Sequence, residues 1–165
     1  LTLSSARQGY KMKDENDLAF DDGERLEDGI HTAVNAWCDD RDAAKSRYGP
    51  IASWNTSEIT NMWALFYNEA NFNGDISRWD VSSVTNMSAM FRDAASFDCD
   101  LSQWDVSKVT DMNYMLHGAT SFTHQLGGAW STSTAYKGCM FRNCPGSIAG
   151  KTNNADGICL SFSTS

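Results

Sequence analysis

Carboxylates recur in the middle of the chain at spacings that suit a metal ion or a hydrolytic reaction. Rows of carboxylates can hold calcium, although the fixed ligand spacing of a calcium loop is absent. Alternatively, turn aspartates accept hydrogen bonds from their own backbone. A glycosidase needs two acids at a set separation in a cleft, whereas a repeated sequence brings acids together by copying alone. We therefore expect no catalytic pair and no cofactor, with calcium as the open alternative. The acids are Asp75, Asp80, Asp98, Asp100 and Asp105.

Cysteine and histidine are the other residue types here that could do chemistry. No CxxC or paired metal spacing occurs, so a zinc site is not expected. No Cys/His catalytic motif is present either, and we expect a protein that is not an enzyme. One or two disulfides in an oxidising compartment fit better. Cys139 and Cys144, five residues apart around a turn region, are the expected pair, and Cys38 could be a buried helix residue with no bond.

These residues are set in a repeat of 25 residues. Residues 54–72, 79–97 and 104–122 are copies of one another, and the second reads WDVSSVTNMSAMFRDAASF. Counting from each tryptophan, offsets three, six, eight and eighteen are always Ser, Thr, Met and Phe. A fixed period of this length is the signature of a repeat architecture. A fourth, degenerate copy begins at Trp130, one residue late.

Each copy predicts the same local structure. The V-T-x-M segment alternates and carries β-branched residues, which suits a short parallel strand. The following SAMFRDAASF segment suits one or two turns of helix. We therefore predict an α/β fold: a short, leucine-rich-repeat-like solenoid of parallel strands and short helical turns, capped by an N-terminal α-helix.

The chain divides into four parts that form one domain. Residues 1–20 are expected to be an extended arm, and residues 21–50 a capping helix with one apolar stripe. Residues 51–128 hold the three repeats, and residues 129–165 a degenerate repeat and C-terminal cap. The stripe comprises Leu26, Ile30, Val34 and Trp37.

Candidate contact residues stand where the copies disagree. Trp63 occupies a position where the other copies have Ser88 and Asn113. We therefore expect it to point outward, whereas the tryptophan that starts each copy is expected in the core rather than on a sugar-binding platform. The predicted contact surface comprises Trp63, Tyr67, Arg92, Tyr114 and His117.

Charge narrows the range of partners. The formal net charge is −8 and no Lys/Arg cluster stands out. Nucleic acid and anionic membrane surfaces need a concentrated basic face, so neither is an expected partner. No apolar run of membrane-spanning length occurs, and we expect no direct membrane insertion.

The motif W-D-V-S-x-V-T-x-M-x-x-M-F, followed by A-x-x-F and D-L-S-x-W-D, carries a resemblance. It resembles the repeat of the BspA-like surface proteins, a leucine-rich-repeat-like family of bacterial surface lipoproteins and single-celled algae. The resemblance covers about residues 24–126. It implies a parallel-stranded solenoid with roles in adhesion or protein binding, and it implies no catalytic residues. Departures are Asn55-Thr56 in the first copy and Leu116 in the third.

Together these observations predict a non-catalytic protein–protein interaction or structural module. It would present a repeat-built surface at a cell surface or as a subunit of a larger assembly. The alternative is a carbohydrate-binding or adhesive module that uses exposed aromatics and turn aspartates. The expected location is extracellular, at the cell surface, or in an organelle lumen.

Overall fold

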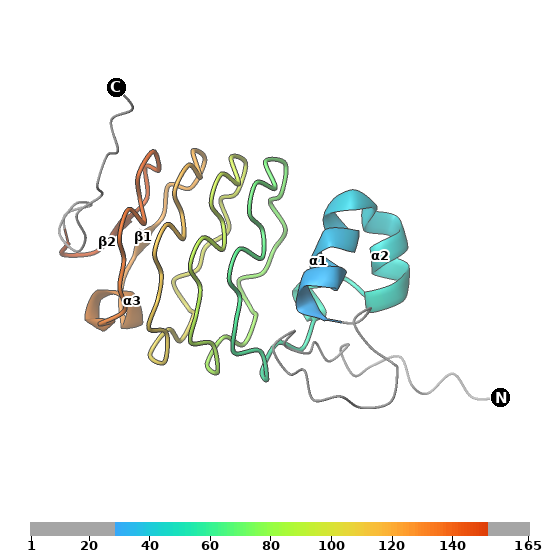
Figure 1. Ribbon diagram of the computed structural model, residues 1–165, viewed down its shortest axis with the longest axis horizontal. Helices are drawn as coiled ribbons and strands as arrows, with labels where there is room; N and C mark the ends of the chain where they lie inside the picture. Colours follow the sequence, from blue (N-terminus) through green and yellow to red (C-terminus); the bar gives the residue numbers. More distant parts are fainter. Residues whose placement is uncertain (1–28, 152–165) are drawn as a thin grey trace, which may run out of the picture.

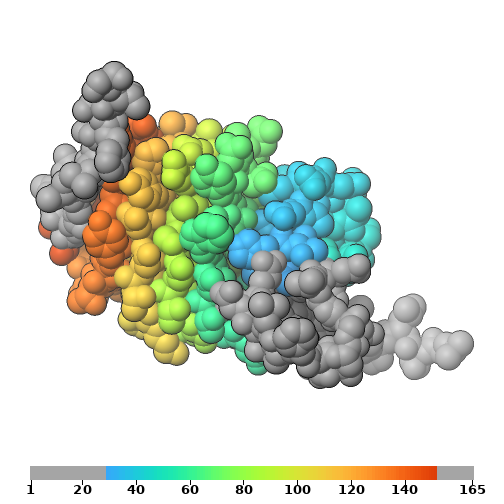
Figure 2. Space-filling view, in the orientation of Figure 1, coloured from blue at the N-terminus to red at the C-terminus, as the bar shows by residue number. Residues whose placement is uncertain are grey.

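The computed structural model describes residues 29–151, in which two helices stand at one end of a row of stacked 25-residue copies (Figure 1). In the space-filling view the copies form adjacent bands that follow the order of the sequence (Figure 2). The expected arm over residues 1–20 and the C-terminal cap beyond residue 151 lie outside the described residues.

The helical end of the molecule consists of α1 (Ile30–Asp39) and α2 (Arg41–Tyr48). The expected capping helix over residues 21–50 is thus two helices in its described part, because the chain turns at Asp40. There the Asp40 side chain accepts a hydrogen bond from the backbone N–H of Ala43 at 3.0 Å, a typical N-cap of the second helix. A short 3-10 helix, η1 (Ile51–Ser53), leads into the first copy.

This end covers the apolar face of the first copy. Ile30, Val34 and Trp37 of α1 are buried. The Trp37 ring meets the Trp54 ring edge to face, with centroids 5.8 Å apart, and Tyr48 approaches Trp54 in the same way at 6.0 Å. Such aromatic contacts add to the free energy gained by burial.

The copies are joined by backbone hydrogen bonds that recur in the same pattern between each copy and the next. The N–H of Met62 donates to the carbonyl of Asn86 at 2.8 Å, and the N–H of Met87 donates to that of Asp111 at the same distance. In the opposite direction, the N–H of Thr85 donates to the carbonyl of Thr60. These bonds place each side chain beside the equivalent side chain of the next copy. A residue type that packs well against an identical side chain therefore suits every copy.

The predicted fold class is wrong. Within residues 29–151 the only sheet is a parallel pair of two-residue strands, β1 (Gln125–Leu126) and β2 (Ser147–Ile148). The segments expected as strands form only isolated bridges, such as Asn61 with Asn86. The segments expected as helical turns are non-helical turns. The expected α/β fold, a leucine-rich-repeat-like solenoid of parallel strands and short helical turns, is therefore corrected to stacked turns with few helices.

The reason lies in the backbone of each turn. Two residues four apart adopt positive φ in successive copies: Ala64 and Asn68 in the first, Ala89 and Asp93 in the second. A right-handed helix requires negative φ at every residue. Left-handed residues at this spacing stop both a helix and a regular strand, although the side chains alone are compatible with either.

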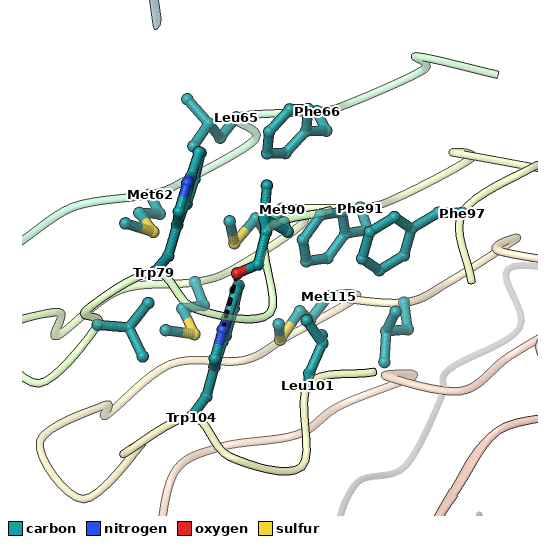
Figure 3. Close-up of a cluster of buried hydrophobic side chains, with 14 of the residues drawn as sticks. Met62, Leu65, Phe66, Trp79, Met90, Phe91, Phe97, Leu101, Trp104 and Met115 are labelled. Carbon is teal, nitrogen blue, oxygen red and sulfur yellow. Dashed lines mark hydrogen bonds between the residues drawn. The ribbon is translucent and has the colours of Figure 1, made fainter. Parts of the chain in front are cut away.

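The core is built from ladders of identical side chains (Figure 3). The Phe91 and Phe97 rings stack with centroids 3.9 Å apart, and Phe97 stacks on Phe122 of the next copy at 5.9 Å. The indole N–H of Trp104 donates to the carbonyl of Ile76, 28 residues earlier, at 3.2 Å, and that of Trp79 donates to the carbonyl of Ile51 at 2.8 Å. The expectation that the repeat tryptophans belong to the core is confirmed: Trp54, Trp79, Trp104 and Trp130 are all buried.

The fourth copy ends the described part of the row. A short helix, α3 (Ala129–Thr132), carries Trp130, whose indole N–H donates to the Leu101 carbonyl at 3.0 Å. Trp130 therefore takes the ladder position although it is one residue late in sequence. The register has returned by Tyr136, which bridges with Asp111 at the regular spacing of 25.

Candidate interaction surface

Four of the five predicted acids accept hydrogen bonds from their own turns, whereas Asp98 accepts from the N–H of Thr123 in the next copy at 3.0 Å. A carboxylate oxygen of Asp75 accepts hydrogen bonds from the hydroxyl of Ser77 at 2.7 Å and from its N–H at 3.1 Å. The same Asp-x-Ser turn recurs at Asp80, Asp100 and Asp105. Among residues 29–151, no three His, Cys, Asp or Glu side chains are placed to hold a metal ion. These carboxylates thus stabilise turns, and the geometry offers no support for calcium.

The turns lower the pKa values of their aspartates and predict a loss of stability in acid. The serine hydroxyl and N–H hold the pKa of Asp75, Asp80 and Asp105 below the ordinary value of 3.8, and for Asp100 the N–H of Ser102 has the largest effect. A lowered folded-state pKa contributes stability that is complete above the unfolded value and is lost as the pH falls through the folded value. We expect the midpoint of thermal unfolding to fall as the pH drops below 3.8.

The matched control is a variant with all four aspartates changed to asparagine. Asn55 already makes this turn in the first copy, accepting from the Ser57 N–H at 3.2 Å. The variant should fold and lose less stability between neutral pH and acid than the parent. An acid loss of the same size in both proteins would show that other groups cause it.

The cysteines are arranged differently from the prediction. Cys144 is a buried free thiol, and Cys139 takes part in a disulfide, so the predicted Cys139–Cys144 pair does not form. The two side chains diverge because Cys139 is exposed in part on the turn whereas Cys144 contacts the Phe122 carbonyl in the core at 3.7 Å. Burial raises the pKa of Cys144 to about 11, and that of Cys38 to about 12. Both thiols are therefore protonated and poor nucleophiles at neutral pH.

The large exposed aromatic side chains of the described residues gather on the turns of one side. Trp63 is 55% exposed, Tyr67 48% and Tyr136 55%. Trp63 and Tyr67 lie nine and thirteen positions after Trp54, and Tyr136 lies six positions after Trp130. Backbone hydrogen bonds align the turns of neighbouring copies in this part of each copy. We call the resulting surface the aromatic strip; it comprises Trp63, Tyr67, Arg92, Tyr114, His117 and Tyr136.

The middle of the aromatic strip is a set of direct contacts across three copies. The guanidinium carbon of Arg92 lies 5.6 Å from the Tyr67 ring centroid and 5.3 Å from that of Tyr114. The Tyr114 ring meets His117 edge to face at 5.7 Å. Asp93 lies between the two basic groups, 3.4 Å from Nε of Arg92 and 3.7 Å from Nδ1 of His117. The structure thus brings together four of the five predicted contact residues.

The two ends of the strip are Trp63 in the first copy and Tyr136 in the fourth. The Trp63 carbonyl is hydrogen-bonded to Nε2 of His31 at 2.8 Å, which links this turn to α1. The Tyr136 ring lies over Gly138, where an added Cβ would collide with it. Three steps of about 4.8 Å separate the outer copies, so the strip is long enough to contact several residues of a partner.

Sequence reasoning missed Tyr136 and Asp93. Tyr136 replaces Asn61, Asn86 and Asp111 of the other copies, so a comparison at the strict spacing of 25 would have revealed it. Counting the fourth copy from Trp130, which is one residue late, shifts the comparison by one position and conceals this correspondence. No sequence signal distinguishes Asp93, because its importance comes from the two side chains that it contacts.

Comparison with known protein families finds a family model whose match covers the repeated part of the chain. A family model described as "Mycoplasma protein of unknown function, DUF285" matches residues 39–152, more than half of the chain. The chain belongs to this family. The match begins within α1 and takes in all four copies, so membership rests on the repeat and hence on the ladders that build it. No curated protein and no solved structure matches the chain. None of the helices between residues 29 and 151 has the length and apolar character that crossing a membrane requires.

Proposed function

We propose that this chain is a non-catalytic interaction module whose aromatic strip binds another protein, at a cell surface or within a larger assembly. The observation that carries the proposal is the grouping of Trp63, Tyr67 and Tyr136, all about half exposed, on one set of turns. Exposing large apolar side chains together is unfavourable unless a partner covers them. Trp, Tyr and Arg are the residue types that dominate binding energy at protein interfaces.

Two further observations support the proposed location of the protein. The family to which the chain belongs is related to BspA-like surface repeats, in keeping with a surface role. The disulfide at Cys139 supports an oxidising compartment, either extracellular or in an organelle lumen.

Site-specific photo-cross-linking tests the proposal. A photoreactive phenylalanine derivative placed at Trp63 or Tyr136 should cross-link to a protein in the native source material. The same group at the exposed Gln103, outside the strip, is the matched control and should not label the same protein. Equal labelling from all three positions would contradict a role for the strip.

Carbohydrate binding is the second candidate, because a half-exposed Trp63 and Tyr136 also offer faces on which sugar rings stack. A glycan array probed with the protein, with and without calcium, distinguishes the two. Glycan binding that is lost in Trp63→Ala, together with no protein cross-link, would favour this candidate over protein binding.

A further inference from the structure

The centre of the aromatic strip is an arginine held in a fixed position. Arg92 lies between the rings of Tyr67 and Tyr114, which belong to the preceding and following copies. A cation over an aromatic face is attracted by the ring quadrupole, and two rings restrict the long side chain from both sides. An arginine that is already ordered loses less conformational entropy when it binds a ligand.

One edge of this guanidinium is occupied and the other is available. Nε of Arg92 is buried and forms an ion pair with Asp93, 3.4 Å from its Oδ2, without a hydrogen bond among the described residues. The two Nη nitrogens have no hydrogen-bond partner among residues 29–151, and the side chain is 38% exposed. The guanidinium fork matches a carboxylate bidentately. The free end therefore offers paired donors to an incoming anion.

Asp93 is placed so that its carboxylate orients Arg92 through the Nε side of the guanidinium. Its backbone has positive φ, and its carboxylate packs directly over Gly118, where a Cβ would collide with it. Of the four copies, only the third has glycine at this position; the others have Asn68, Asp93 and Asn143. The missing side chain at 118 makes room for the carboxylate between Arg92 and His117.

The charge of the strip contrasts with that of the whole chain. The chain carries a formal net charge of −8, and the rows of Asp-x-Ser turns are acidic. The equivalent positions of the last three copies instead carry Arg92, His117 and the exposed Arg142, so two arginine charges stand in this row beside the carboxylate of Asp93. An acidic partner would be repelled by most of the protein surface and attracted to these arginines. This difference favours binding at one site and in one orientation.

We propose that Arg92, clamped between Tyr67 and Tyr114, binds an Asp or Glu carboxylate in an acidic segment of the protein partner. The aromatic ends of the strip, Trp63 and Tyr136, then contact apolar side chains that flank the acid. This inference rests on the proposed function and adds the chemistry of the partner. A peptide is favoured over an acidic glycan because Tyr, Trp and Arg together form the composition of protein interfaces.

Selection from a random peptide library on the immobilised full chain tests this proposal. We expect the selected peptides to be enriched in Asp or Glu next to an aromatic or aliphatic residue, and to bind more weakly as salt increases. Arg92→Gln should weaken binding of the best peptide at least about tenfold, which corresponds to about 1.4 kcal/mol. Arg92→Lys should also weaken it, because an ammonium group cannot form the bidentate pair. Arg78→Gln, at an exposed arginine outside the strip, should have no effect.

The outcomes separate this inference from the proposed function. Peptides that lose binding in Trp63→Ala but are not acidic, or that bind Arg92→Gln unchanged, would overturn the carboxylate proposal and leave the strip as a protein-binding surface. Failure to select any peptide would overturn the carboxylate proposal, and with no cross-link from the strip the proposed function fails as well. Binding of oligouronates instead of acidic peptides would overturn the choice of partner. Circular dichroism of each variant confirms that it is folded before binding is compared.

Discussion

Replacement of Trp104 by alanine is expected to lower the free energy of unfolding by about 3–5 kcal/mol. Trp104 is 2% exposed in an interior copy, with neighbouring copies on both sides. Removing the indole leaves a cavity that the stacked backbone cannot close, because hydrogen bonds fix the copies at a constant spacing. It also leaves the Ile76 carbonyl without the donor that bonds it at 3.2 Å, which adds the cost of a buried unsatisfied group.

The chain supplies its own matched control for this prediction. Trp63→Ala removes the same side chain from a position that is 55% exposed, and should change stability by no more than about 0.5 kcal/mol. Urea denaturation followed by far-ultraviolet circular dichroism measures both. Similar losses in the two variants would mean that the tryptophan ladder does not carry the stability of the stack.

Replacement of Met87 by lysine is expected to prevent folding, or to cost more than about 3 kcal/mol. Met62, Met87 and Met112 form a fully buried ladder, and the fourth position of this ladder is Lys137. Lys137 is tolerated because its ammonium group donates to the carbonyls of Ser133 at 2.8 Å and Ala135 at 3.0 Å.

An interior lysine would not find the same partners. The carbonyl of Thr85, which corresponds to that of Ala135, already accepts the N–H and the hydroxyl of Thr110 in the next copy. A lysine at position 87 would therefore lack one of the two acceptors that Lys137 uses, and a buried charge with incomplete hydrogen bonding costs several kcal/mol.

Equilibrium unfolding of three variants tests this account. Met87→Leu conserves volume and should cost less than about 1.5 kcal/mol, whereas Lys137→Met should cost less than Met87→Lys. The deficit of Met87→Lys should shrink as the pH rises towards the ordinary lysine pKa of about 10.4, because the folded state favours the neutral amine. A Met87→Lys protein as stable as the Leu variant at neutral pH would refute the argument from occupied carbonyls.

The repeat alone predicted correctly which side chains form the core. Trp, Met and Phe recur at constant offsets, and every such residue in the first three copies is buried. This follows because equivalent positions of stacked copies contact one another, so an apolar residue in an interior copy favours apolar residues at the same position of its neighbours. Lys137, in the last copy of the methionine ladder, is the exception because two carbonyls bind its ammonium group. The same logic predicted the exposure of Trp63, where the copies differ, and the turn aspartates that bond their own backbone.

Secondary structure was predicted less well. The segment SAMFRDAASF has the spacing of a helix, yet Ala89 and Asp93 adopt positive φ and the segment is a turn. Alanine carries no sequence signal for such a backbone. The second position does carry one, because Asn68, Asp93, Gly118 and Asn143 are the residue types that most readily adopt positive φ. The hydrogen bonds to neighbouring copies select this conformation over the local preference.

The sequence by itself determined the period, the ladders of buried residues and most members of the aromatic strip, since each depends only on comparing copies. Only the tertiary structure decided which of these side chains contact one another. The clamp on Arg92 by Tyr67 and Tyr114 joins residues 25 and 22 positions away in sequence, and the role of Asp93 depends on the empty space above Gly118. Such contacts arise from the register of one copy on the next, which backbone hydrogen bonds set and side-chain composition does not encode.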